Sequence, residues 1–166
     1  FIMKALILAA GVSRRLYPQT YNTPKCLLEV GGKPIINYQL EALSELGIND
    51  ITMIVGYHRE MLVESVEKNF HYLIFFKFIV NHHYFETNTA YSVYVGKEEL
   101  SDQHLLMNAD VVYPKELLLK LYHSSFENVL AVDIKSCGRE EVKVIDGGQN
   151  KISAIGKDLI EDQCLG

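Results

Sequence analysis

The sequence has few cysteines, no long hydrophobic run and no excess of positive charge. Each of these absences argues against one class of protein. Three cysteines, Cys26, Cys137 and Cys164, are an odd number without metal-site spacing, so we expect a reduced, cytoplasmic protein. No apolar run is long enough to span a bilayer, which argues against a membrane partner. The formal net charge of -5 argues against a general nucleic-acid-binding surface.

The length and apolar content indicate one domain with a substantial core. The chain has 166 residues, of which 48% are hydrophobic, and this is within the usual range of a single domain. We expect the domain to cover residues 3–166, because Phe1 and Ile2 precede Met3 and are excluded. The sequence does not indicate an oligomeric state.

Apolar strands and amphipathic helices alternate along the chain. The apolar, β-branched and aromatic runs predict strands at 3–9, 51–55, 73–80, 104–107 (a central strand), 129–134, 141–145 and 151–155, the last two joined by a hairpin turn at 146–150. Helices are expected from Pro34 to a stop at Gly47, over 59–69 with Met61, Leu62 and Val66 inward, from 87 or 88 to 95, and over 114–122. The order predicts an α/β fold: a Rossmann-like three-layer α/β/α sandwich with a mostly parallel mixed sheet.

The most informative segment is the loop that follows the first strand, residues 11–27. Gly11 and Ser13 allow the backbone to turn tightly, so that main-chain amides can face an anion. Arg15 and Lys25 add two positive charges to the same loop. Such a loop suits a polyphosphate better than a neutral ligand, and the alternative is a surface loop with solvated charges. A P-loop is excluded because Gly11 lacks the Gly-x-x-x-x-Gly-Lys partners, and a dinucleotide fingerprint because Ser13 and Arg15 replace its glycines.

A single carboxylate, Asp110, follows the expected strand 104–107. Ligands of open α/β sheets bind at the carboxyl ends of the strands. Mg²⁺ takes one or two protein carboxylates and completes its shell with phosphate and water. Asp110 is therefore the candidate metal ligand, and the alternative is that it caps the turn before Pro114.

The loop reads G-x-S-x-R-L-x-P-x-T-x-x-x-P-K-x-L from Gly11 to Leu27, and this pattern resembles the signature of nucleotidyltransferases that act on sugar phosphates and alcohol phosphates. The resemblance implies a fold of the nucleotide-diphospho-sugar transferase type and an enzyme that uses Mg²⁺ and a nucleoside triphosphate and releases pyrophosphate. It also implies that Arg15 and Lys25 are catalytic, that Asp110 binds the metal, and that the nucleotide contacts Leu8, Ala9, Ala10, Gly11, Ser13 and Arg14.

The segment 81–94 narrows the resemblance. Its Asn88-Thr-Ala-Tyr-Ser92 stretch is similar to a stretch of the phosphocholine cytidylyltransferases, which implies CTP as the nucleotide and a phosphorylated small alcohol such as phosphocholine as the acceptor. Asn88 and Ser92 would then bind the pyrimidine or its ribose. Alternatively, Asn88 caps a helix and Ser92 faces a neighbour.

Two other functions stay open at this point. One is a sugar-1-phosphate nucleotidyltransferase that uses UTP, TTP or GTP, and the other is a non-catalytic nucleotide-binding domain. Members of the resembling group continue past a Gly-Glu-x-Ile-Gly stretch, of which Gly166 matches the first residue. The resemblance therefore implies a domain that lacks its C-terminal part, and we expect it to bind nucleotide better than it turns it over.

Overall fold

The computed structural model describes residues 3–72, 75–100, 103–139, 141–160 and 164–165. The chain forms two compact units, residues 1–115 and 116–166. None of the helices within the described ranges is long and apolar enough to cross a membrane.

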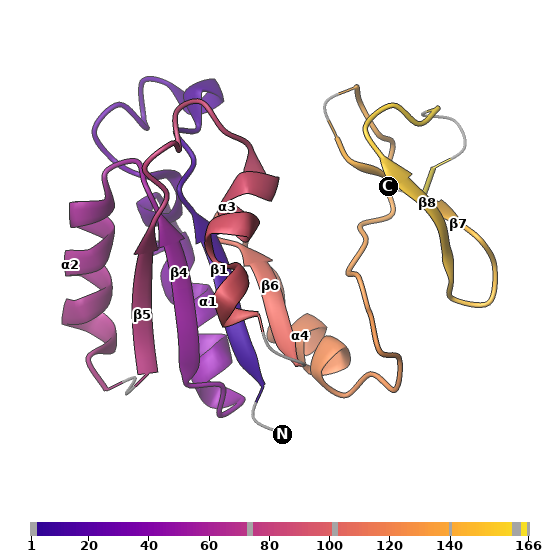
Figure 1. Ribbon diagram of the computed structural model, residues 1–166, viewed down its shortest axis with the longest axis horizontal. Coiled ribbons are helices and arrows are strands. Elements are labelled where there is room, and N and C mark those ends of the chain that lie inside the picture. Colours follow the sequence, from indigo (N-terminus) through magenta and orange to yellow (C-terminus); the bar gives the residue numbers. More distant parts are fainter. Residues whose placement is uncertain (1–2, 73–74, 101–102, 140, 161–163, 166) are drawn as a thin grey trace. The chain divides into compact units, whose positions relative to one another are not determined.

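A four-stranded parallel sheet organises the first unit (Figure 1). Its strand order is β5-β4-β1-β6, and every neighbouring pair is parallel. The chain runs from β1 outward through β4 to β5 and then returns to the other side of β1 to add β6. The bounds of the strands are β1 (Lys4–Ala9), β4 (Asp50–Val55), β5 (Phe75–Val80) and β6 (His104–Asn108).

Helices cover both faces of this sheet. The helices α1 (Ile35–Glu45) and α2 (Arg59–Phe70) follow β1 and β4, and α3 (Thr89–Val95) follows β5. Right-handed crossovers in opposite directions place their helices on opposite faces, and Figure 1 shows α3 in front of the sheet and α1 behind it. The predicted α/β/α sandwich is therefore confirmed, with a parallel sheet.

Close packing joins α3 to the sheet. Leu6 and Ile54 are buried on the face that α3 covers. A Cβ atom on Gly96, at the end of α3, would stand 2.8 Å from Ile54 Cδ1, so glycine allows the helix end to approach the strands. On the other face, α1 buries Ile36, Leu40 and Leu43 completely.

The helix predictions hold with two differences. Pro34 is the cap residue of α1 and not its first helical residue, while the stop is confirmed because Gly47 follows the helix with φ +74°. Met61 is 41% exposed, whereas Leu62 and Val66 are buried. The inward stripe of α2 runs at four-residue spacing from Leu62 through Val66 to Phe70, and Met61 lies about 100° away from it.

The strand β6 lies at the edge of the described sheet and not at its centre, because β1 is its only partner there. Its side chains alternate: Leu105 and Met107 are buried, and Leu106 is 51% exposed. The apolar run that suggested a central strand thus has one covered face.

The second unit begins within α4 (Lys115–Tyr122) and contains an antiparallel hairpin of β7 (Lys143–Asp146) and β8 (Ile152–Gly156). The predicted turn is confirmed: the Gly147 N–H donates to the Lys151 carbonyl at 2.7 Å, and Gly148 has φ +79°. The predicted strand at 129–134 is wrong, since these residues form no ladder. Strand propensity alone cannot make a strand without a partner.

Candidate functional site

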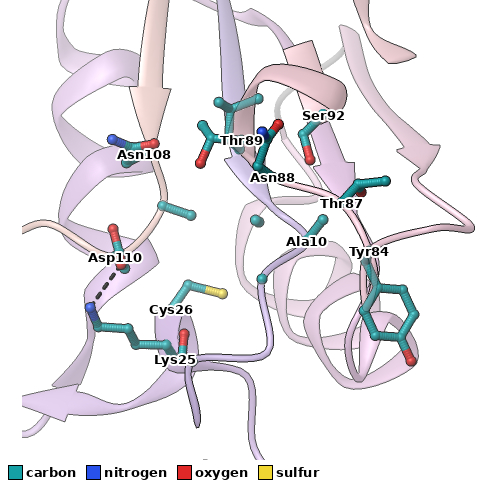
Figure 2. A pocket seen from close by; sticks show the side chains of 15 residues that line it. Ala10, Lys25, Cys26, Tyr84, Thr87, Asn88, Thr89, Ser92, Asn108 and Asp110 are labelled. Atoms are coloured by element: carbon teal, nitrogen blue, oxygen red, sulfur yellow. Dashed lines mark hydrogen bonds and ion pairs between the residues drawn. The ribbon is translucent and has the colours of Figure 1, made fainter. Parts of the chain in front are cut away.

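A cavity of about 380 Å³ opens at the carboxyl ends of β1 and β6. These adjacent strands are the point where the sheet order reverses, and open α/β sheets bind ligands at such a point. Figure 2 shows Lys25 and Asp110 on one side of the cavity and Asn88, Thr89 and Ser92 on the other. The lining residues are Leu8, Ala9, Ala10, Gly11, Ser13, Lys25, Cys26, Tyr84, Thr87, Asn88, Thr89, Ser92, Asn108, Ala109 and Asp110.

The loop after β1 is held in a defined shape by its own hydrogen bonds. Ser13 has the left-handed conformation, φ 55°, and precedes the short 3-10 helix η1 (Arg14–Leu16). The hydroxyl of Thr20, which is fully buried, donates to the Ser13 carbonyl at 3.0 Å. Ser13, and not Gly11, thus makes the left-handed turn.

The turn after β4 supports the middle of the same loop. The Tyr57 hydroxyl lies 2.9 Å from the Thr20 carbonyl and 2.7 Å from the Tyr21 carbonyl, and the Tyr57 amide donates to the Ala10 carbonyl at 3.2 Å. The pKa of Tyr57 is raised, mainly by burial and to a smaller extent by the neighbouring Tyr17. Tyr57 therefore stays a neutral hydrogen-bond donor.

Within the described part of the chain, the amides of Gly11 and Val12 have no acceptor. A Cβ atom on Gly11 would meet nothing within 4 Å. Unpaired amides beside a cavity are donors for an anion, so the start of the loop has the features expected of a phosphate site.

Lys25 and Asp110 form an ion pair at the cavity. Lys25 begins the 3-10 helix η2 (Lys25–Leu27), and Asp110 follows β6. Lys25 Nζ lies 2.7 Å from Asp110 Oδ2, with the side chains 32% and 40% exposed. The structure thus brings together two groups that are 85 positions apart in the sequence.

An adjoining cavity of about 390 Å³ carries the arginines of the loop. Its lining shares Ser13, Lys25 and Asp110 with the first cavity and adds Arg14, Arg15 and Leu16. The Arg14 guanidinium carbon lies 4.2 Å from the centre of the Phe85 ring, which indicates a cation–π contact. Three cationic side chains and one carboxylate therefore line this cavity.

Asn88 and Ser92 have structural roles and also line the cavity. Asn88 caps α3, and its Oδ1 accepts a hydrogen bond from the Tyr91 amide at 3.2 Å. The buried Ser92 hydroxyl oxygen accepts one from Asn81 Nδ2 at 3.1 Å. The expected cap is confirmed, and nucleotide binding by these two residues stays a prediction.

Asn81 is a residue that sequence reasoning missed. It is buried directly after β5, and its Nδ2 also donates to Thr87 Oγ1 at 3.2 Å, while its Oδ1 accepts from the His83 amide at 2.9 Å. It thereby shapes the segment that leads to α3. The available signal was its position: like Asp110, it is a polar residue at the carboxyl end of an apolar strand.

Five other lining residues were not predicted, namely Tyr84, Thr87, Thr89, Asn108 and Ala109, and Cys26 was expected only to pack. Burial raises the pKa of the Cys26 thiol to about 12, so it is not a thiolate nucleophile at neutral pH. The expectation that Cys26 packs is consistent with this.

The donor set at the cavity fits a metal that arrives with phosphate. Among the described residues no three or more His, Cys, Asp or Glu side chains gather as a metal site, so Asp110 would be a lone carboxylate ligand. Mg²⁺ commonly keeps one or two carboxylates and takes its other oxygens from phosphate and water. One carboxylate facing an anion-binding loop suits that arrangement.

Comparisons with known proteins agree with this geometry. The family model described as "Nucleotidyl transferase" matches residues 4–137. Choline-phosphate cytidylyltransferase of Streptococcus pneumoniae is 41% identical over 131 residues, which are 79% of this chain and 55% of that protein. The solved structure of the CTP:phosphocholine cytidylyltransferase from that species has a TM-score of 0.70 and 34% identity, covering 93% of this chain and 64% of its own.

Two further relatives use other acceptors by name. CTP:phosphoglutamine cytidylyltransferase of Campylobacter jejuni is 35% identical over 81% of this chain and 54% of that protein. A mannose-1-phosphate guanyltransferase of Schizosaccharomyces pombe is 37% identical over 68% of this chain and 32% of that protein. The chain thus spans about half the length of the two cytidylyltransferases it matches.

The resemblance read from the Gly11–Leu27 loop and from the Asn88–Ser92 segment is therefore confirmed at the level of the family. The matched residues 4–137 include every predicted site residue, from Leu8 to Asp110. On this match and on the identity to the pneumococcal enzyme, the chain belongs to the nucleotidyl transferase family.

Proposed function

We propose that the chain transfers a cytidylyl group from CTP to a small phosphorylated alcohol such as phosphocholine and releases pyrophosphate. The observation that carries the proposal is the meeting of Lys25 and Asp110 beside the anion-binding loop. The printed names of two relatives support CTP. Because the chain covers about half of these relatives, the activity of the whole protein is part of the proposal.

The chemistry follows from the charges. A phosphate oxygen of the acceptor attacks the α-phosphorus of CTP, a new P–O bond forms, and the bond to the pyrophosphate oxygen breaks. The acceptor is already an anion, so no general base is needed, and catalysis is positioning and charge stabilisation. Arg15 would neutralise the β- and γ-phosphates, and Lys25 would bind the α-phosphoryl oxygens, where charge grows.

Asp110 would hold Mg²⁺, which when bound neutralises phosphate charge.

The Lys25–Asp110 ion pair would have to open when the ligands bind. Both groups serve the nucleotide only after they separate, so that Asp110 faces a cation and Lys25 faces phosphate. Each then exchanges one opposite charge for another, and neither is left unpaired.

The other side of the cavity would receive the nucleoside. Backbone and side chains of Leu8, Ala9 and Ala10 line the wall next to β1. The Asn88 cap uses the amide oxygen, so its NH₂ group is still able to donate to a pyrimidine or ribose oxygen.

Nucleotide preference tests the proposal. A ligand that binds only the native state stabilises by mass action, so CTP with Mg²⁺ should raise the melting temperature of the chain more than ATP, GTP or UTP does. Equal shifts for the four nucleotides would remove the case for cytidine. A dominant shift with GTP or UTP would favour a sugar-phosphate transferase instead, which the match to the guanyltransferase makes the second candidate.

Turnover separates an enzyme from a binding domain. Pyrophosphate release should occur with CTP and phosphocholine, and should be measured on the chain and on the whole gene product against a panel of phosphorylated alcohols and sugar 1-phosphates. Release only with a sugar 1-phosphate would contradict the proposed acceptor. Binding of CTP without release for any acceptor would favour a nucleotide-binding domain without catalysis.

A further inference from the structure

We propose that Gln39, in the middle of α1, is the positioning residue that sets where the Asp110 carboxylate stands. The inference rests on the proposed function, because it concerns the role of Asp110 as a metal ligand. It predicts that a residue outside both cavities controls how strongly Mg²⁺ promotes nucleotide binding.

The hydrogen bonds of Gln39 bracket Asp110. Its Nε2 donates to the Asn108 carbonyl at 2.8 Å and to the Val111 carbonyl at 2.7 Å. Both N–H bonds of one amide group are used on the main chain, two residues before Asp110 and one residue after it. The turn that carries the carboxylate is therefore fixed at both ends by a single side chain.

The sheet fixes the same turn from another direction. The Ala109 amide donates to the Leu8 carbonyl of β1 at 3.0 Å, and Ala109 is buried. The backbone at Asp110 is thus held by these hydrogen bonds, while its side chain points outward to Lys25 Nζ, 2.7 Å away. Gln39 thus acts on the ion pair through the backbone and touches neither charged group.

Gln39 is a buried amide among apolar side chains. It is 1% exposed and lies in the apolar stripe of α1 with Ile36, Leu40 and Leu43, each completely buried. A buried amide costs free energy unless it is hydrogen-bonded. Gln39 Oε1 is buried without a partner among the described residues, so only the two N–H donors of the amide offset the cost of burying it. Both donors act on the turn that carries Asp110.

Outer groups of this kind matter for metal sites. Hydrogen bonds that orient a metal ligand typically affect metal affinity or activity by about 10–100-fold when removed. We therefore expect Gln39→Met, which keeps length and apolar packing but has no donor, to lose about 10-fold or more of the Mg²⁺-dependent gain in CTP affinity. CTP binding without Mg²⁺ should change little, because the hydrogen bonds of Gln39 go to residues 108 and 111 and not to the loop 11–27.

The experiment is calorimetry of CTP binding at several Mg²⁺ concentrations, together with circular dichroism and melting. Leu43→Met is the matched control: it changes an equally buried residue, one turn further along the same helix, to the same side chain and removes no hydrogen bond to the Asp110 turn. It should leave the Mg²⁺ dependence of CTP affinity as in the wild type. An equal loss in Leu43→Met, or an unchanged Mg²⁺ dependence in Gln39→Met, would overturn the proposal.

A second variant keeps the shape of the side chain. In Gln39→Glu the ionised carboxylate cannot donate, whereas its protonated form donates one hydrogen bond. Because burial favours the protonated form, its Mg²⁺-dependent CTP binding, relative to the wild type at each pH, should fall as the pH is raised and the carboxyl ionises. A ratio that does not change on ionisation of this carboxyl would contradict the inference. If the wild type itself bound CTP without any Mg²⁺ effect, the proposed function would fail and not the Gln39 assignment alone.

Discussion

Lys25 and Asp110 show how a pair that contributes little to stability can be useful for binding. About a third of each side chain is exposed, and exposed ion pairs contribute typically about 0–1 kcal/mol because water screens them. Such a pair costs little to open. The two groups can therefore exchange this pairing for ligand contacts at little cost. The buried Thr20 and Asn81, in contrast, fix the shape of the loops.

The two basic residues of the loop should be separable by kinetics. We predict that Lys25→Ala lowers kcat by on the order of 10²–10³ and changes CTP affinity much less, because a charge that acts mainly in the transition state affects the rate. Arg15→Ala should raise the Kd for CTP as well. Steady-state kinetics and calorimetry provide the two numbers, and a near-normal kcat in Lys25→Ala would show that the assigned role is wrong.

Asp110→Asn distinguishes a metal ligand from a cap. The change hardly alters volume, so we predict an unchanged melting temperature and the loss of Mg²⁺-dependent CTP binding. A cap would survive the change, since asparagine caps as well as aspartate. Asp50→Asn is the control, because Asp50 is also partly exposed and also pairs with a lysine, Lys4, at 3.2 Å, but at the start of β4. Mg²⁺-dependent binding that persists in Asp110→Asn would mean that the metal is held elsewhere.

At the scale of elements, the sequence predicted what depends on local pattern. Helix α1, helix α2, the cap at Asn88 and the hairpin turn follow from spacing and turn chemistry, which act within a few residues. The prediction of a strand at 129–134 was wrong because an apolar β-branched run becomes a strand only beside a partner. The prediction that 104–107 is a central strand was wrong for the same reason: strand order depends on contacts between distant segments, and β6 lies at the edge of the described sheet.

The site divides in the same way. Gly11, Lys25 and Asp110 were predicted because a loop motif and a polar strand end are visible in the sequence. Gln39 was not, since its apolar neighbours one turn away make its position look like ordinary core, and the two carbonyls it binds are about 70 residues away in the chain. Residues that act through the backbone of a distant turn leave no local pattern.

The two glycines near the cavity should respond differently to a methyl group. A Cβ atom on Gly56, after β4, would stand 2.6 Å from Tyr84 Cβ and 2.9 Å from the Ala10 carbonyl oxygen. We predict that Gly56→Ala destabilises the fold by about 1–3 kcal/mol, the usual cost of overpacking. Gly11→Ala meets nothing within 4 Å, so its melting temperature should stay near that of the wild type while its CTP affinity falls, if phosphate approaches that backbone.

Urea unfolding and CTP titration of both variants check this contrast. A Gly11→Ala variant with normal CTP affinity would indicate that no ligand group comes close to this backbone. A Gly56→Ala variant as stable as the wild type would indicate that Tyr84 moves away without cost.

At the scale of the whole molecule, the topology explains why these groups meet. The chain leaves β1 in one direction and returns to its other side only after β5, so the loops after β1 and β6 stand next to each other with no helix between them. Parallel strands aim both loops to the same edge. A cationic loop and a carboxylate from the two halves of the unit therefore line one cavity. We expect the binding of a nucleotide there to change the affinity for a metal, and the reverse.

That meeting predicts a reciprocal coupling between Mg²⁺ and CTP. In the ligand-free protein Lys25 already neutralises Asp110, so Mg²⁺ alone must displace a cation and should bind weakly. The triphosphate draws Lys25 away, and CTP should then raise Mg²⁺ affinity by the same factor by which Mg²⁺ raises CTP affinity, within the roughly 5–150-fold range of such couplings. Lys25→Met removes the competing cation, so Mg²⁺ should bind this variant more tightly than the wild type without nucleotide. The part of the coupling that comes from the protein, and not from Mg²⁺ binding to CTP itself, should then become smaller.

Calorimetric titration of each ligand in the presence and absence of the other measures all four affinities. Because Mg²⁺ also binds free CTP in solution, the nucleotide-free titration is the decisive one, and an unchanged Mg²⁺ affinity in Lys25→Met would show that the ion pair does not compete with the metal.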